Sequence, residues 1–270
     1  MRKKKIITIQ CSVVLILVVF FFRYQIVNKI QTNVLKNVNG TALSSNDHLL
    51  AGNDFYFDHK IRSLKGVEKI LPHRVNSLER FEYLYDDFKG FECDIIIDPL
   101  HNVFRIAHDP EEISSLSFNQ FLERDNDKKL FWMDVKNLDT NTMYSFCKHL
   151  NFLNSKYNLK ERAIIESGNS SLLKQIADSG YLTSLYFHVN DSLMKLSESA
   201  DISSYILNTD GLLSQDVFWL KLMNENYPRK KKIVWDISFY TSLNAGLLKK
   251  YIEDTTILLC LINIKSPAYR

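Results

Sequence analysis

The sequence predicts an α/β fold, a (β/α)8 barrel of the TIM type, on three observations. Short apolar runs rich in β-branched residues recur along the chain and alternate with amphipathic, helix-like stretches. Eight such runs fall within about 200 residues, a length typical of one barrel domain. The phosphate-binding motifs GxGxxG and GxxxxGKS/T do not occur, which removes the usual support for an open doubly wound sheet. An open doubly wound sheet is thus the less favoured alternative.

A membrane anchor is predicted ahead of the barrel. Residues 6–22 (IITIQCSVVLILVVFFF) contain no charged residue and follow four basic residues at positions 2–5. Such a run is just long enough to span a bilayer as a helix, and the basic residues favour a cytoplasmic N-terminus. We predict a single transmembrane signal anchor over 1–23 and a periplasmic, extracellular or lumenal location for the rest. A cleavable signal peptide is the alternative, but bulky residues follow the run.

A stalk is expected between the anchor and the barrel, over residues 24–66. Its stretch VNGTALSSNDHLLAGND is rich in Asn, Ser and Gly and shows weak periodicity. The barrel is then expected over 67–270. The sequence stops at IKSPAYR, soon after the last apolar run. The eighth helix of the barrel is therefore expected to be reduced or missing.

The strands and helices of the barrel are predicted in order from the same patterns. Each strand is a short apolar run bounded by polar or turn-forming residues. The strands are predicted at 69–73, 91–98, 130–136, 162–167, 184–189, 204–208, 232–238 and 255–264. Examples of helices, where apolar residues recur every three or four positions, are predicted at 77–88, 140–157, 170–180 and 243–254.

Charge and cysteine content argue against two classes of function. The formal net charge of +3 is too small to point to nucleic acid. The basic run Arg229–Lys232 is interpreted as a solvated loop that enters a strand, with contact to anionic lipid headgroups as the alternative. The four cysteines lack CxxC spacing, so a zinc site is not expected. Cys93 and Cys260 lie in predicted strands and are interpreted as buried thiols, with disulfide pairing left open.

Polar residues gather at the C-terminal ends of the predicted strands, where the active sites of TIM barrels lie. In chain order they are His73 and Arg74, Glu92 and Asp94, His108, Asp134 and Lys136, Glu166, and Trp235. Of the remaining histidines, His149 is expected on a helix surface, and His188 at the end of the fifth strand.

Three of these residues predict a metal site. Glu92 and Asp94 lie two apart, hence on one face of a strongly apolar strand. A buried carboxylate pair is costly unless a metal ion or a lysine lies beside it. With Asp134 on the next strand, the set predicts a hard-cation site with oxygen ligands for one Mg²⁺ or Ca²⁺. The alternatives are an outward-facing edge for Glu92 and Asp94 and a simple salt bridge between Asp134 and Lys136.

The other polar residues suit an anionic substrate. His73 and His108 can titrate near neutral pH, and Arg74 and Lys136 supply positive charge. Together with a metal ion, such groups are suited to phosphodiester chemistry. We expect His73 and Arg74 to face the phosphate of a substrate and Asn76 to help orient it.

The order of these motifs resembles the glycerophosphodiester phosphodiesterase superfamily, metal-dependent barrels related to phosphatidylinositol-specific phospholipase C. The motifs are His-Arg, Glu-x-Asp, His-Asp and an acidic residue-x-Lys, and the match covers residues 69–136. The resemblance implies an acid/base pair of His73 and His108, metal ligands Glu92, Asp94 and Asp134, phosphate contacts Arg74 and Lys136, and a pocket wall that includes Trp235. Glu166 is expected to contact the substrate or to support the groups that do.

The sequence departs from the usual family pattern in several places. It reads HRVNS where these enzymes usually read HRG, and Asp134-Val135-Lys136 where they usually have Glu-x-Lys. The usual T-x-D-G before the second histidine is replaced by DPLHNVF. The His-x-x-Asn and Asp-x-Lys features resemble the sphingomyelinase D and phospholipase D toxin branch, and His-x-x-Asn-Ser is similar to the menorin proteins.

The sequence therefore predicts a membrane-anchored, metal-dependent phosphodiesterase that uses two histidines as acid and base. Its expected substrate is a glycerophosphodiester, a lysophospholipid or a phosphodiester-linked envelope glycan. One alternative is a phospholipase D-like enzyme that forms a cyclic phosphate. Another is a barrel that has lost activity and binds lipid or glycan.

Overall fold

The computed structural model describes residues 65–111, 115–187, 189–190, 195–196, 200–216, 220–235 and 245–264. The anchor predicted over 1–23 and almost all of the predicted stalk lie outside these residues, so both stay predictions. None of the described helices combines the length and the apolar character that crossing a membrane requires.

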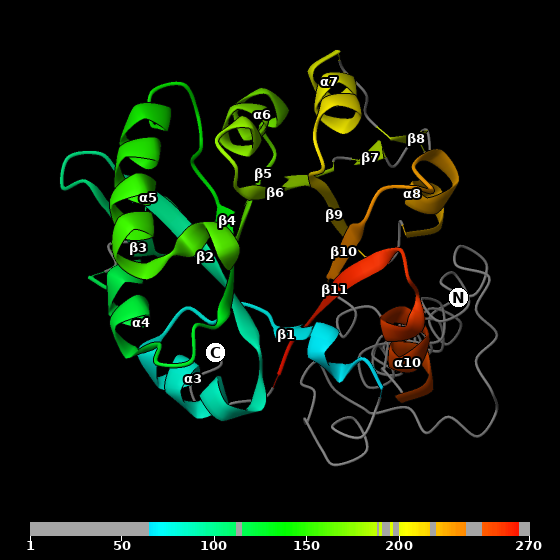
Figure 1. Ribbon diagram of the computed structural model, residues 1–270, viewed down its shortest axis with the longest axis horizontal. Coiled ribbons are helices and arrows are strands. Elements are labelled where there is room, and N and C mark those ends of the chain that lie inside the picture. Colours follow the sequence, from blue (N-terminus) through cyan, green and yellow to red (C-terminus); the bar gives the residue numbers. More distant parts are fainter. Residues whose placement is uncertain are drawn as a thin grey trace, which may run out of the picture.

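A curled, mostly parallel sheet forms the centre of the molecule (Figure 1). Its parallel strands are β1 (Ile70–Pro72), β2 (Gly90–Asp98), β4 (Leu130–Val135), β5 (Ala163–Ser167), β6 (Leu182–Tyr186), β9 (Leu212–Asp216), β10 (Lys232–Trp235) and β11 (Ile257–Ile262). Hydrogen-bonded neighbours follow the order β1-β11-β10-β9-β6-β5-β4-β2. The curl brings the chain after β1 back to β2, where Val75 N donates to Glu92 O at 2.9 Å. This arrangement is consistent with the predicted TIM-type fold.

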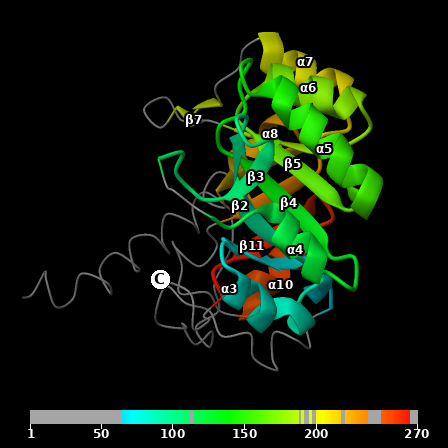
Figure 2. The same ribbon diagram turned by 90° about the vertical axis from the view of Figure 1, so that its left-hand side faces the viewer.

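Helices follow the strands along the chain and lie outside the ring of strands (Figure 1). They are α3 (Leu78–Leu84), α4 (Phe118–Arg124), α5 (Met143–Tyr157), α6 (Ser170–Asp178), α7 (Ala200–Asn208), α8 (Leu220–Asn226) and α10 (Ala245–Glu253), with single 3-10 turns at η1 (Val67–Lys69), η2 (Tyr85–Asp87) and η3 (Leu159–Glu161). In the side view α4, α5 and α6 cover the same side of β4 and β5 (Figure 2). The described residues end at Ile264, two positions after β11, so the reduced eighth helix that the sequence predicts stays a prediction.

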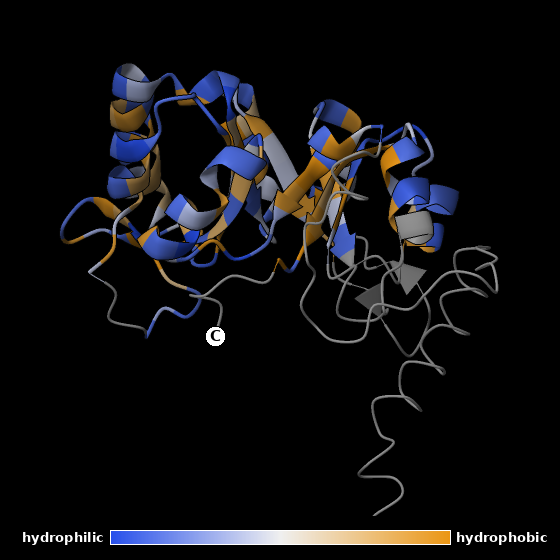
Figure 3. Ribbon diagram, turned by 90° about the horizontal axis from the view of Figure 1, so that it is seen from below, coloured by the Kyte–Doolittle hydropathy of each residue, from blue (hydrophilic) through white to orange (hydrophobic). Residues whose placement is uncertain are grey.

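The two faces of the strands bury different clusters, because consecutive side chains point to opposite sides. Facing the helices, the Phe81 ring of α3 lies 4.9 Å from those of Phe91 in β2 and Phe121 in α4. Trp132 of β4 belongs to a separate buried cluster with Leu71 and other strand residues. In Figure 3 the strands are accordingly coloured mostly as hydrophobic, whereas the surrounding helices carry mixed colours.

β2 and β4 approach each other closely at their first residues. Gly90 pairs with Leu130, and a Cβ atom at position 90 would overlap the Leu130 carbonyl. Only glycine therefore allows this register. The same pairing places Asp94 beside Asp134 four residues later, so the close contact at Gly90 sets the alignment of the predicted metal ligands.

An additional strand, β3 (Val103–Ile106), pairs antiparallel with β2 and forms a hairpin that the sequence did not predict. The hairpin turn is held by Asp98, whose carboxylate accepts from the Leu100 and His101 backbone N–H groups at 3.1 Å each. Downstream of β3, Ala107 N donates to Asp94 O at 3.2 Å. The hairpin thereby returns the chain to the end of β2 and delivers His108 beside it.

The strand predicted at 204–208 is wrong, because these residues end helix α7. Ile202, Tyr205 and Ile206 have helical spacing and pack against the core, and the Tyr205 hydroxyl lies 2.9 Å from Thr183 Oγ1. The sixth parallel strand is β9, which the apolar pattern missed because it buries the polar side chains of Ser214 and Gln215. A β-branched, aromatic run such as SYILN is compatible with both states until packing decides between them.

The solvent exposure predicted for Lys232 and His149 is wrong. Lys232 ends the basic run predicted as a solvated loop entering a strand; it does begin β10, but it is buried, and its ammonium donates to Tyr227 O and Lys230 O at 2.8 Å each. His149, predicted on a helix surface, is buried in α5 with its ring edge-on to Phe104 at 4.6 Å. Both side chains carry a polar group on an apolar body, and the body decides their burial here.

Candidate active site

A cavity of about 440 Å³ lies at the C-terminal ends of the parallel strands. Of the residues predicted from the sequence, the cavity is lined by His73, Arg74, Glu92, His108, Asp134, Lys136, Glu166 and Trp235. Asp94 is not among the lining residues, but its carboxylate contacts Lys136, which lines the cavity. The fold therefore brings together residues as far apart in the sequence as His73 and Trp235, as expected for the mouth of a parallel barrel.

Strand register aligns the acidic residues in one row. Asp94 of β2 pairs with Asp134 of β4, which pairs with Glu166 of β5, which pairs with Ser184 of β6. Residues paired across parallel strands point to the same side of the sheet. The row therefore runs across four neighbouring strands at one level of the sheet.

The carboxylates of Glu92, Asp94 and Asp134 form a compact cluster. Each places one oxygen within 4.8 Å of the others. Glu92 and Asp94 are buried, and among the described residues Oε1 of Glu92 has no hydrogen-bond partner. Burial, reinforced by Asp94 and Asp134, raises the pKa of Glu92 well above its ordinary value, and burial also raises the pKa of Asp134. An unpartnered buried oxygen beside two further carboxylates fits a divalent cation, which prefers oxygen ligands.

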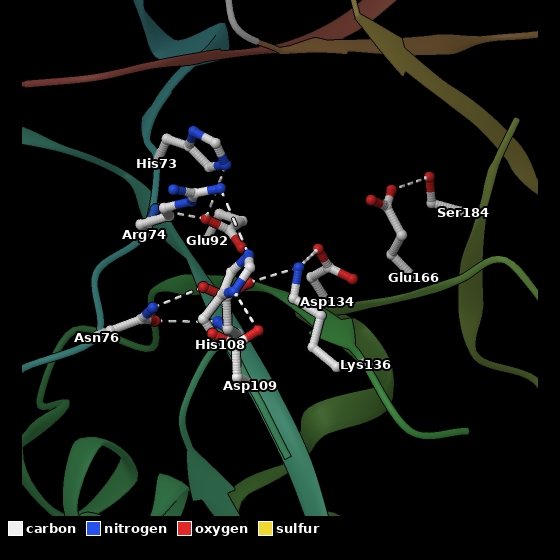
Figure 4. Close-up of polar contacts among 11 residues, drawn as sticks. His73, Arg74, Asn76, Glu92, His108, Asp109, Asp134, Lys136, Glu166 and Ser184 are labelled. Atoms are coloured by element: carbon white, nitrogen blue, oxygen red, sulfur yellow. Dashed lines mark hydrogen bonds and ion pairs between the residues drawn. The ribbon is translucent and has the colours of Figure 1, made fainter. Parts of the chain in front are cut away.

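Lys136 is the cation that already contacts this cluster. Its Nζ lies 2.7 Å from Asp94 Oδ1 and donates to Asp134 Oδ2 at 2.5 Å (Figure 4). Burial on its own would lower the pKa of Lys136, but Asp134 and Asp94 outweigh it and raise the pKa. One ammonium cannot balance three carboxylates, so the ionised cluster keeps a net negative charge that a bound metal ion would offset.

His73 is held at the end of β1 by the last described strand. Its Nδ1 lies 3.0 Å from Oδ1 of Asn263. An amide oxygen can only accept, so in this arrangement Nδ1 carries the hydrogen and Nε2 keeps its lone pair, 3.7 Å from Glu92 Oε2. Burial, with Arg74 adding to it, lowers the pKa of His73 to about 4. The ring is therefore neutral near pH 7 and can accept a proton at Nε2.

His108 and Arg74 lie together at a more exposed part of the cavity. Arg74 Nη2 is 3.5 Å from His108 Nε2, and His108 Nδ1 is 3.1 Å from Asp109 Oδ1. Arg74 has a left-handed backbone with φ 54, and its N–H donates to Glu92 Oε2. This backbone conformation places the residue between the carboxylate cluster and the second histidine (Figure 4).

Asn76 supports the carboxylate cluster. Its Nδ2 donates to Asp94 Oδ2 at 2.6 Å, and its Oδ1 accepts from Asp94 N at 3.0 Å. Both ends of the amide are turned to Asp94, and the predicted role of Asn76 in orienting a substrate stays a prediction. The side chain fixes one of the predicted metal ligands.

Glu166 and Trp235 line the part of the cavity away from the histidines. Glu166 is buried and accepts from Ser184 Oγ at 2.8 Å, apart from the cluster around Lys136 (Figure 4). Burial, and to a lesser extent Asp134, raises its pKa well above the ordinary value. The Trp235 ring stacks on Tyr186 with the centroids 5.6 Å apart. This part of the cavity therefore combines an aromatic wall with a buried carboxyl group.

Three supporting residues were missed by the sequence analysis. Asn263 follows the last strand, so the same strand-end rule that found Glu166 could have found it. Ser184 needs the register between β5 and β6, which no short motif encodes. Arg80 lies on the buried side of α3, where an arginine gives no signal of function; its guanidinium donates to His73 O and Ile264 O.

Comparison with solved structures identifies the fold. A glycerophosphodiester phosphodiesterase from Parabacteroides distasonis superposes with a TM-score of 0.54 at 15% sequence identity, over 72% of this chain and 92% of that one. The described chain shares the fold of this phosphodiesterase. The predicted resemblance to the superfamily is thus confirmed at the level of fold, whereas the sphingomyelinase D and menorin branches stay predictions.

Two further solved structures are similar at lower scores. One, from Silicibacter pomeroyi, is assigned as a glycerophosphoryl diester phosphodiesterase, with TM-score 0.48, 12% identity, and 63% of this chain and 82% of that one covered. The other, from Galdieria sulphuraria, is assigned as a glycerophosphodiester phosphodiesterase, with TM-score 0.47, 11% identity, and coverage of 72% and 93%. The fold assignment rests on the Parabacteroides structure. By sequence, the chain matches no protein-family profile and no curated protein.

Proposed function

We propose that this protein is a metal-dependent phosphodiesterase that cleaves a glycerophosphodiester or a closely related diester. One observation carries the proposal: two histidines, two basic side chains and a cluster of three carboxylates meet at one cavity. Phosphodiester cleavage needs an acid, a base and positive charge at the phosphate, and these groups supply all three. The shared fold with the Parabacteroides phosphodiesterase supports the same reaction class.

The two histidines divide the proton transfers between them. His73 is buried, neutral and has its Nε2 lone pair free of the Asn263 contact, so it accepts the proton of the attacking oxygen. His108 lies on a different segment beside Arg74 and protonates the leaving oxygen. Arg74 and Lys136 bind the phosphoryl oxygens. The attacking oxygen comes from water, or from a hydroxyl of the substrate, in which case the product is a cyclic phosphate.

The metal site would be formed by Glu92, Asp94 and Asp134, with Asn76 orienting Asp94. A bound Mg²⁺ or Ca²⁺ would stabilise the charge that develops on the phosphoryl oxygens. Lys136 holds Asp94 and Asp134 in place from the side of the cavity. Its ammonium also adds a second positive charge near the phosphate.

The part of the cavity away from the histidines suits a substrate whose alcohol group is compact and hydroxylated better than one with an acyl chain. Glu166 and the Tyr186–Trp235 stack combine a hydrogen-bonding carboxyl group with an aromatic surface. The indole N–H of Trp235 is buried, and no described residue accepts from it. Such polar groups favour a partner with hydroxyl groups, because an acyl chain would leave them unpaired. We therefore place glycerophosphodiesters ahead of lysophospholipids among the predicted substrates.

Matched substrates test this proposal with the purified full-length protein. Glycerol and propyl esters of p-nitrophenyl phosphate share the leaving group and differ only in hydroxyl groups. We expect turnover of both, EDTA to abolish it, Mg²⁺ or Ca²⁺ to restore it, and kcat/KM to favour the glycerol ester at least about tenfold. Absence of turnover with either ester and either ion would overturn the phosphodiesterase assignment. Equal turnover would overturn only the preference for a hydroxylated group.

We also propose that the enzyme works outside the cytoplasm, anchored by residues 1–23. The proposal rests on the charge-free run 6–22 behind four basic residues. Protease added to intact cells stripped of their wall should digest the barrel, while a cytoplasmic marker protein survives. Protection of the barrel until the cells are lysed would reverse the proposed topology.

A further inference from the structure

A buried arginine, Arg80, lies behind the first histidine. Arg80 is 2% exposed and projects from α3 toward the ends of β1 and β11. Its Nη1 donates to Ile264 O at 2.9 Å, and its Nη2 donates to His73 O at 3.2 Å. A buried charge is costly unless its environment is arranged to hold it, and these two carbonyl groups are part of that environment.

The two carbonyl groups that Arg80 joins belong to the segments that hold His73. His73 N donates to Ile262 O at 3.0 Å, its ring contacts Asn263, and its carbonyl is tied through Arg80 to Ile264. Backbone nitrogen, ring and carbonyl of one histidine are thus fixed to three consecutive residues. Helix α3 makes this connection through the Arg80 side chain.

Arg74, the residue after His73, has a backbone conformation that this connection helps to hold. Arg74 adopts φ 54, a strained conformation for a non-glycine residue that persists only when its surroundings enforce it. On one side it is held by its N–H bond to Glu92 and by its carbonyl, which accepts from Asn76 N at 2.9 Å. On the other side the preceding carbonyl is the one that Arg80 binds.

We propose that Arg80 is a positioning residue for the reaction, which holds the His73–Arg74 backbone so that both side chains face the phosphate. This inference rests on the proposed phosphodiesterase function. Arg80 does not line the cavity and does not contact the reacting atoms. Its planar guanidinium binds the two carbonyls through two separate nitrogens at a fixed spacing, which the single nitrogen of a lysine ammonium cannot reproduce.

Arg80→Met tests the proposal, because methionine keeps the unbranched apolar stem and removes the donors. At a temperature where circular dichroism shows a folded protein, we expect kcat to fall at least about tenfold, since small misplacement of reacting groups is costly. KM for the glycerol ester and the calorimetric metal affinity should stay within about twofold, which separates positioning from loss of binding. Arg80→Lys should fall between the wild type and Arg80→Met.

Arg124→Met is the matched control, because Arg124 is a surface arginine on α4 that pairs with Glu82 at 3.2 Å. It should keep the wild-type kcat. Wild-type kcat in folded Arg80→Met would overturn the proposal, and so would parallel losses of kcat, metal affinity and folding. If Arg80→Met does not fold, Arg80→Lys decides, and wild-type kcat in that variant is the contrary result.

A second measurement does not depend on turnover. Nitrogen NMR with isotope-labelled histidine reports which ring nitrogen of His73 carries the hydrogen. The Asn263 contact requires the Nδ1–H form in the wild type, and Arg80→Met should shift the ring toward a mixture of tautomers. An unchanged tautomer would overturn the positioning role even if the wild-type enzyme cleaved no diester. Failure of the proposed function and failure of this inference therefore give different results.

Discussion

Replacing either His73 or His108 by alanine should lower kcat for a phosphodiester by at least about a hundredfold, the lower end for general acid–base catalysis. Nε2 of His73 lies 3.7 Å from Glu92 Oε2, and Nε2 of His108 lies 3.5 Å from Arg74 Nη2, so both rings lie beside groups of the cavity. Loss of either removes one of the two proton transfers. Metal binding measured by calorimetry should survive in both variants, because neither histidine belongs to the carboxylate cluster.

His101→Ala is the matched control for these two variants. His101 is exposed and pairs with Asp98 at 2.8 Å in the β2–β3 hairpin. It should retain wild-type turnover. Phosphorus NMR of the wild-type products separates hydrolysis from formation of a cyclic phosphate. Near wild-type kcat in both His73→Ala and His108→Ala would remove the acid–base mechanism while leaving the fold assignment intact.

Most of the site could be predicted because its residues obey local rules. Glu92 and Asp94 share a face by strand periodicity, and His73, Glu166 and Trp235 lie at strand ends, where a barrel places its active site. These rules need only the strand positions. The apolar runs located seven of the eight parallel strands well enough, and β9 failed because its buried residues are partly polar.

The supporting residues could not be predicted because their roles depend on contacts between distant segments. Arg80 and Asn263 meet His73 from α3 and from the end of β11, and only the curl of the sheet brings these elements together. The contact of Asn76 with Asp94 could not be predicted either. It arises because Val75 is hydrogen-bonded to Glu92 and carries the chain alongside β2.

The structure also shows how the two interpretations of Asp134 and Lys136 relate to each other. The sequence left open whether Asp134 and Lys136 form a simple salt bridge or belong to a metal site. The structure places Lys136 between Asp94 and Asp134, while Glu92 Oε1 has no hydrogen-bond partner among the described residues. A salt bridge therefore exists, and it leaves one buried carboxylate oxygen unpaired, so the two interpretations are compatible.

Asp134→Ala should abolish measurable binding of Mg²⁺ or Ca²⁺ in calorimetry and lower kcat at least about a hundredfold. The variant lacks one oxygen ligand, and without the metal ion the charge on the phosphoryl oxygens is no longer stabilised. Asp134 suits this test better than Glu92 or Asp94, because it is the least buried of the three. Its removal also frees Lys136 from one of two carboxylates.

The unfolding midpoint supplies a second measurement of the same site. A ligand that binds only the folded state stabilises it, so millimolar Mg²⁺ or Ca²⁺ should raise the midpoint of the wild type but not of Asp134→Ala. Asp178→Ala, which removes an exposed carboxylate paired with Lys174, should keep the wild-type response. Equal metal affinity in Asp134→Ala and the wild type would contradict the assignment of the triad, because the remaining pair of Glu92 and Asp94 would then have to hold the ion without the ligand from β4.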